Sequence, residues 1–225
     1  MKLVTFQSLD ALEFLNKNGY LVCNDNFINK EKYGEVYNWI VEKMESKIKN
    51  TTNVKYPIWA WVKCYNGTCP PKVKNKDQIE QFRVKITFHK DEKDIFITDY
   101  RRYSFVLKNF YIPNSLKDKE QFDKKLEKYN ITDEDLKAYI RKDKYDKHRE
   151  DKAYLNICRQ IRKNFDRCIT KDSNILQGCV WKINKDEIDK IEIIKDDGYL
   201  YGSLNYIRAN GKRMDWVKQF YKLLK

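Results

Sequence analysis

The stretch Val54–Val62 constrains the fold more than any other part of this 225-residue chain. Pro57 lacks the backbone N–H that a sheet ladder uses, so a strand begins there or lies at a sheet edge. Beyond it, three aliphatic residues alternate with two tryptophans: Ile58, Ala60 and Val62 with Trp59 and Trp61. Because alternate residues of a strand point to opposite faces, the pattern predicts a strand with one aliphatic and one indole face.

A second apolar run, Ile175–Ile183, has the composition of a partner strand and carries Gln177 and Trp181. If the two strands lie side by side, three indole rings come together. Indoles either bury a large apolar area in a core or form a wall on which a flat ring stacks. The sequence leaves both interpretations open, and the ligand-binding interpretation uses four aromatic side chains: Tyr56, Trp59, Trp61 and Trp181.

Capping signals mark the expected helices. Ser8 is predicted to cap a short helix that Gly19 ends in the left-handed conformation. Apolar residues at spacings of three and four predict a longer helix over residues 31–49. The alternating run Val84–Phe88 predicts a strand, followed by a turn and a return strand. Asp99 is expected to end that return strand and to cap the next helix.

Residues from about 116 to 169 are expected to be helical and heavily charged, and residues from about 190 to 225 to form a hairpin and a helix. No internal repeat or flexible linker interrupts the chain. The expected fold is a single α+β domain over residues 1–225, with a small mixed or antiparallel sheet as its core and a charged helical insertion.

The formal net charge of +13 indicates either a polyanionic partner or a solvated basic face. Arg101 and Arg102 stand in the first turn of a predicted helix, where cations oppose the helix dipole. Arg159, Lys163 and Arg167 form a basic stripe that suits phosphate groups. These five residues are the predicted contacts to nucleic acid, with DNA and RNA both left open.

Cysteine and hydropathy patterns exclude several classes of protein. Six cysteines without a Cys-x-x-Cys pair, and two distant histidines, predict no metal site. Thiols in a reducing cytoplasm are the expected state. No apolar run approaches about 18 residues, so a membrane is not an expected partner. The first residues turn polar too early for a signal peptide, and the expected location is the cytoplasm.

Motifs of the common hydrolases and phosphate-binding enzymes are missing from the sequence. It has no Walker loop, no Gly-x-Gly-x-x-Gly and no His-Glu-x-x-His. It also has no serine in a nucleophile elbow. Carboxylates are plentiful, but only Asp99 and Glu192 stand in apolar runs. The sequence therefore argues against a classical hydrolase.

Several stretches together resemble the DUF3841 family of bacterial and prophage proteins. They are Thr5–Leu21, Tyr56–Trp61 and Ile97–Pro113, and Leu176–Trp181 is similar to the final motif of that family. The resemblance spans most of residues 1–195.

The order of these motifs is also similar to that of DarT-type ADP-ribosyltransferases, which modify DNA using NAD. Their strand that ends in Asp before a helix is matched by Asp99, and their final Gln-Ala-Glu-Phe strand is matched in position by Gln177. The resemblance implies an ADP-ribosyltransferase-like core, NAD as the cofactor, and Asp99 and Gln177 as candidate catalytic residues. Cys179 stands where the catalytic Glu would be. Without that carboxylate, the transferase chemistry is lost or is rebuilt from another acid.

We therefore expect a nucleotide- or nucleic-acid-binding protein with an ADP-ribosyltransferase-like core that acts in conflict between phage and bacterium. One alternative is a non-catalytic nucleic-acid-binding module. Another is an inhibitor of a host nuclease or defence complex, which binds a host or phage protein. Affinity for free DNA that falls steeply with salt is expected of the binding module and not of the inhibitor.

Overall fold

The computed structural model describes residues 1–24, 30–65, 67–68, 81–141, 148 and 150–196. Its contacts group the chain into two compact units. The first unit comprises Met1–Asp25, Val41–Ile97 and Asp172–Met214, and the second comprises Asn26–Ile40, Thr98–Lys171 and Asp215–Lys225. Each unit is described by itself, so the expectation of one domain stays a prediction. The predicted C-terminal turn and helix beyond residue 196 lie outside the described residues.

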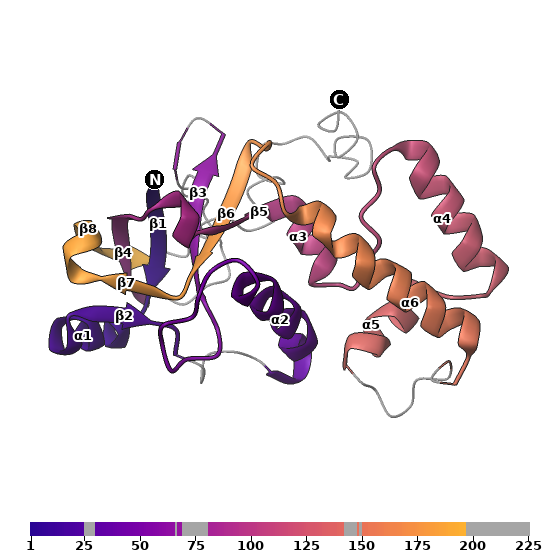
Figure 1. Cartoon of the computed structure of the whole chain (residues 1–225), viewed down its shortest axis with the longest axis horizontal. Helices are drawn as coiled ribbons and strands as arrows, with labels where there is room; N and C mark the ends of the chain where they lie inside the picture. The colour runs from indigo at the N-terminus through magenta and orange to yellow at the C-terminus, as the bar shows by residue number, and fades with distance from the viewer. Residues whose placement is uncertain (25–29, 66, 69–80, 142–147, 149, 197–225) are drawn as a thin grey trace. The chain divides into compact units, whose positions relative to one another are not determined.

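The described part of the chain is a mixed α+β structure whose main sheet has six strands in the order β5-β6-β3-β1-β4-β8 (Figure 1). These strands are β1 (Lys2–Gln7), β3 (Ile58–Cys64), β4 (Gln81–His89), β5 (Phe96–Asp99), β6 (Ile175–Val180) and β8 (Ile188–Asp196). The pairs β1–β3, β1–β4, β3–β6 and β4–β8 are antiparallel. A second, two-stranded sheet pairs β2 (Tyr20–Val22) with β7 (Lys182–Asn184).

Six α-helices lie within the described residues (Figure 1). They are α1 (Leu9–Asn18), α2 (Lys30–Glu45), α3 (Tyr100–Val106), α4 (Leu116–Lys128), α5 (Asp133–Arg141) and α6 (Lys152–Asn164). Short 3-10 helices cover Glu92–Asp94, Phe165–Cys168 and Lys185–Glu187. Within the segment of about 116–169 that is predicted to be helical and charged, the described residues include α4, α5 and α6. The helix predicted over 31–49 is observed as α2. None of the described helices has the length and apolar character needed to span a membrane.

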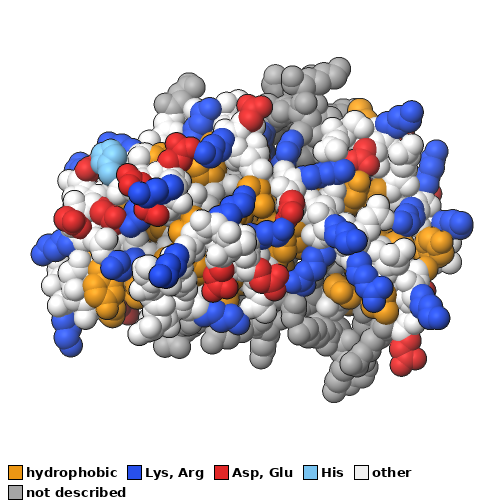
Figure 2. All heavy atoms as spheres, in the orientation of Figure 1, with side chains coloured by type: hydrophobic (Ala, Val, Ile, Leu, Met, Phe, Trp, Pro, Cys, Tyr) orange, Lys and Arg blue, Asp and Glu red, His pale blue; other side chains and the backbone are white. Residues whose placement is uncertain are grey.

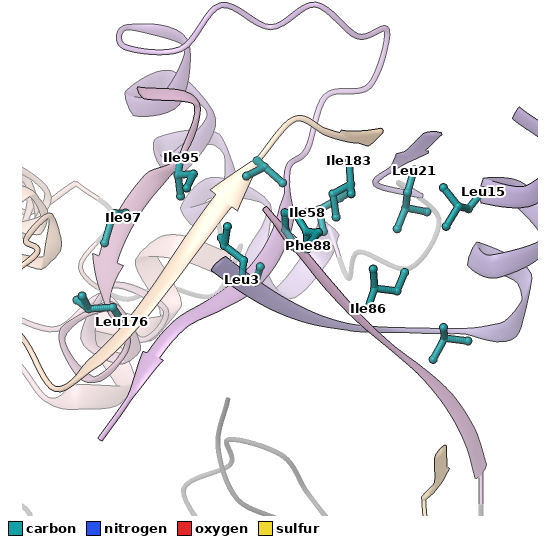
Figure 3. Packing of buried hydrophobic residues seen from close by; sticks show 13 residues of the cluster. Leu3, Leu15, Leu21, Ile58, Ile86, Phe88, Ile95, Ile97, Leu176 and Ile183 are labelled. Carbon is teal, nitrogen blue, oxygen red and sulfur yellow. The ribbon is translucent and has the colours of Figure 1, made fainter. Parts of the chain in front are cut away.

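The core of the first unit lies on one face of the main sheet, beneath α1 and the β2–β7 pair (Figure 3). Leu3, Ile58 and Phe88 come from three adjacent strands and are each at most 3% exposed. Leu15 of α1, Leu21 of β2 and Ile183 of β7 cover them from the other side. Burial of such a large aliphatic set is the main force that holds the two sheets together, because each fully buried side chain contributes about 1.5–3 kcal/mol.

The signals at the ends of α1 are confirmed. The hydroxyl of Ser8 accepts a hydrogen bond from the Ala11 amide at 3.2 Å. Gly19 has a φ of 75° and donates its amide to the Leu15 carbonyl at 2.8 Å. A residue with a Cβ is strained at this dihedral, which is why glycine suits the position.

The expected hairpin between Val84–Phe88 and Ile95–Ile97 is wrong in its pairing. A strand does form at Phe96–Asp99, but it lies at the opposite edge of the sheet, beside β6. Both sides of β4 are taken, by β1 and by β8. The long run Ile175–Ile183 is also two strands, β6 and β7, which belong to different sheets.

Candidate functional site

The two tryptophan-bearing runs do lie side by side. In the antiparallel β3–β6 pair, Trp61 is opposite Gln177 and Trp59 is opposite Cys179. Residues directly opposite in such a pair project from the same face of the sheet. Trp59, Trp61, Gln177 and Cys179 therefore share one face, which is the reverse of the face that carries the aliphatic core.

Most of the predicted aromatic pocket is buried within the first unit. Trp61 is 7% exposed, Trp181 is 4% exposed and Tyr56 is 3% exposed, while Trp59 is half-buried. The indole N–H of Trp181 donates to the Ile48 carbonyl at 3.1 Å, so its one polar atom is satisfied by the protein itself. This arrangement is typical of a tryptophan that packs in a core.

Asp99 lies in the second unit and caps α3. Its Oδ1 accepts hydrogen bonds from the amides of Arg101 at 2.7 Å and Arg102 at 2.9 Å. Its Oδ2 lies 3.6 Å from the guanidinium of Arg101, and the two side chains are only 5% and 10% exposed. The cap predicted from the sequence is confirmed. Both carboxylate oxygens of Asp99 are engaged inside the unit, where they hold a buried arginine at a helix start.

The side chain of Arg102 contacts the 3-10 helix Phe165–Cys168, which follows α6. Arg102 donates from its guanidinium to the Arg167 carbonyl at 2.9 Å. Cys168, next in the chain, is fully buried. Burial raises the pKa of its thiol well above the usual range, and the charge of Asp99 raises it further. The thiol therefore stays protonated and unreactive at neutral pH.

The predicted pocket would join residues of both units. Trp59, Trp61, Trp181 and Gln177 belong to the first unit, and Asp99, Arg101 and Arg102 to the second. A shared pocket of these residues stays a prediction. Among the described residues, no group of three His, Cys, Asp or Glu side chains is placed to hold a metal ion.

Arg167, a predicted phosphate contact, is engaged at the start of α4. Its guanidinium donates to the Ile112 carbonyl at 2.7 Å and to the Asp118 carboxylate at 3.1 Å, and it lies 5.3 Å from the centre of the Tyr111 ring. Burial raises the pKa of Asp118, but hydrogen bonds from Asn114, Tyr111 and Arg167 outweigh it and leave this pKa below its usual value. The side chain of Arg167 therefore links the start of α4 to the 3-10 helix Phe165–Cys168 that follows α6.

The other two predicted contacts lie on the exposed side of α6. Lys152, Arg159 and Lys163 are all exposed, and Asn156 and Gln160 lie exposed among them. Within Lys152–Asn164 there is no Asp or Glu at all. This side of α6 therefore carries positive charge with no acidic side chain on the same helix to neutralise it.

Helix α4 carries most of its lysines and most of its acids on different sides. The exceptions are both paired: Asp118, on the lysine side, with Arg167, and Lys119 with Asp123. Lys117, Lys124 and Lys128 are exposed and recur at spacings of seven and four, which places them along one stripe. The acids form a different stripe, with spacings of three and four: Glu120, Asp123 and Glu127. Lys125 lies on the lysine side of the helix, between that stripe and the buried Phe122.

The lysine side of α4 adjoins the exposed side of α6. The ammonium of Lys125 donates to the Gln160 side chain at 2.6 Å. A second contact joins Asp118 of α4 to Arg167. Asp118 precedes Lys125 by seven residues, whereas Arg167 follows Gln160 by seven, so the two chain segments run in opposite directions. The two contacts fix the helices as antiparallel neighbours (Figure 1). We call the resulting surface the two-helix basic face: Lys117, Lys124, Lys125 and Lys128 of α4 with Lys152, Arg159 and Lys163 of α6.

Figure 2 shows Lys and Arg side chains gathered over the region of α4 and α6, with few Asp or Glu side chains among them. The sequence predicted Arg159 and Lys163, which belong to the α6 half of this surface. It did not predict the α4 half, because lysines and acids are interspersed there in the linear sequence. On a helix of 3.6 residues per turn, Lys117, Lys124 and Lys128 separate from Glu120, Asp123 and Glu127, whereas Asp118 stays on the lysine side.

The chain belongs to the DUF3841 family, a domain of unknown function, whose family model matches residues 2–189. The chain matches no curated protein and no solved structure.

Proposed function

We propose that this protein binds nucleic acid through the two-helix basic face. The observation that carries the proposal is the charge sorting of two adjoining helices. Arg159 and Lys163 lie on a helix without acids. The side of α4 that adjoins this helix carries Lys125, and its one acid, Asp118, is paired with Arg167, whereas Glu120, Asp123 and Glu127 form a different stripe. A surface that needed cations only for solubility would gain nothing from this separation, since mixed charges solvate a helix equally well.

The dimensions suit a phosphate backbone. On α6, Lys152 and Lys163 are eleven residues apart, which corresponds to about 16 Å along a helix axis. On α4, Lys117 and Lys128 have the same separation. Neighbouring packed helices lie about 8–10 Å apart, so the two rows of cations form a track that one backbone can follow. Release of counterions from the bound phosphates would supply most of the affinity.

A nucleotide site in an ADP-ribosyltransferase-like core is the finer version of this proposal. It is supported by the strand register, which pairs Gln177 with Trp61 and places both on the same face of the sheet as Cys179. It is weakened by the burial of Trp61 and Trp181 and by the use of Asp99 as a helix cap. The basic face needs no such pocket, and we therefore favour the binding function.

Titrating the protein with a fluorescent oligonucleotide at several salt concentrations tests the proposal. If about four phosphates are contacted, the logarithm of the binding constant falls against the logarithm of salt concentration with a slope of about −3. Fluorescence anisotropy measures both the affinity and the slope.

A flat salt dependence, or no binding at low salt, would contradict nucleic-acid binding. It would favour the alternative of an inhibitor whose partner is a host or phage protein, because such a protein has no need to hold free DNA.

A further inference from the structure

We propose that the ligand of the two-helix basic face is single-stranded nucleic acid, with one unpaired base stacked on Tyr129. This inference rests on the proposed function and names the class of nucleic acid that the same surface takes. Its support comes from the position, exposure and neighbours of one aromatic side chain.

Tyr129 follows directly on α4 and continues its lysine side. It stands four residues after Lys125, which is one helical turn, and side chains at that spacing are neighbours on a helix surface. Tyr129 is 37% exposed, although it is a large aromatic residue. The ammonium of Lys128 lies 5.5 Å from the centre of its ring. An exposed ring is thus held next to cations that bind phosphates.

The antiparallel contacts place this ring at one end of the track. Lys125 meets Gln160 in the C-terminal half of α6, and the next turn of α4 leads back toward the start of α6. Just beyond Tyr129 the chain becomes acidic, with Asp133 and Glu134 opening α5. Asp151 caps α6 at the same end. A phosphate backbone is repelled there, whereas an uncharged base is not.

The row of cations and the exposed ring of Tyr129 would contact different parts of the ligand. Phosphates follow the lysines of α4 and the cations of α6, and the backbone turns away where the acids begin. A base at that point can rest on Tyr129. Stacking on an aromatic side chain requires an unpaired base, since in a duplex both faces of each base are already stacked. Stacking of this kind tolerates any base, so no sequence preference is expected.

Anisotropy titrations with single-stranded and duplex oligonucleotides of the same sequence test the inference. The wild-type protein is expected to prefer the single strand. Tyr129→Leu is expected to weaken single-strand binding about fivefold or more, because a stacked base is lost. Tyr129→Phe keeps the ring and is expected to keep most of the affinity. Melting curves of both variants check that the helices remain folded.

Tyr20 supplies a matched control in the other unit. It is also 37% exposed, and Lys182 lies 5.4 Å from the centre of its ring. Tyr20→Leu is expected to leave both affinities unchanged. The inference is overturned if duplex binds as tightly as single strand, or if Tyr129→Leu behaves like Tyr20→Leu. It is also overturned if Tyr129→Leu weakens both forms equally. The proposed function itself fails separately, when neither form shows salt-dependent binding.

Discussion

Reversing two charges on α6, with Arg159→Glu and Lys163→Glu together, is expected to weaken nucleic-acid binding about 100-fold. Both side chains are exposed on the acid-free side of the helix. Nonspecific complexes with dissociation constants of about 10⁻⁴–10⁻⁶ M share their free energy among several phosphate contacts, so each contact contributes roughly 1 kcal/mol. Two lost contacts and the added repulsion together cost about 3 kcal/mol.

The same double variant should flatten the salt dependence, because fewer counterions are released. Lys17→Glu with Lys185→Glu is the matched control: both lysines are exposed, both belong to the first unit, and the change in net charge is identical. If the control weakens binding as much as the α6 variant does, the affinity reflects net charge alone and the assignment to the two-helix basic face is wrong.

Asp99→Ala is expected to lower the free energy of unfolding by about 3–5 kcal/mol, because it leaves the buried guanidinium of Arg101 without its carboxylate. It also removes the oxygen that accepts two amide hydrogen bonds at the start of α3. Urea unfolding followed by circular dichroism measures the loss. Asp99→Asn retains an oxygen at the cap and is expected to lose less.

Asp99 is also the residue that the ADP-ribosyltransferase resemblance makes a catalytic candidate. A residue that serves catalysis alone is replaced by Ala with little effect on stability, and often with a gain. An Asp99→Ala variant as stable as the wild type would therefore contradict the structural role, and it would return Asp99 to the list of catalytic candidates.

Local signals in the sequence were read correctly. The caps at Ser8 and Asp99 and the left-handed Gly19 depend on backbone groups within a few residues, so a single sequence contains them. The alternation of Val84–Phe88 predicted β4 for the same reason. These features fix where elements begin and end.

Features that depend on distant parts of the chain were not predictable. Nothing near Ile95–Ile97 reveals that β1 and β8 already flank β4, and the strand that follows therefore pairs elsewhere. Likewise, nothing near Trp181 reveals that the Ile48 carbonyl receives its indole N–H. The same pattern of indoles is compatible with a core and with a ligand pocket, and only the burial distinguishes the two.

The candidate site falls between these cases. Arg159 and Lys163 were found because α6 contains no acids to obscure their stripe. The lysines of α4 were missed because Glu120, Asp123 and Glu127 are interspersed with them. That the two basic sides adjoin depends on the contact between Lys125 and Gln160, which are 35 residues apart in sequence.

Protection of lysines from chemical acetylation, mapped by mass spectrometry with and without a saturating oligonucleotide, tests the central claim most directly. Exposed lysines of the two-helix basic face are expected to become protected: Lys117, Lys124, Lys128, Lys152 and Lys163. Exposed lysines of the first unit are expected to react as before: Lys2, Lys17 and Lys185. Protection of the second set with none of the first would contradict the account.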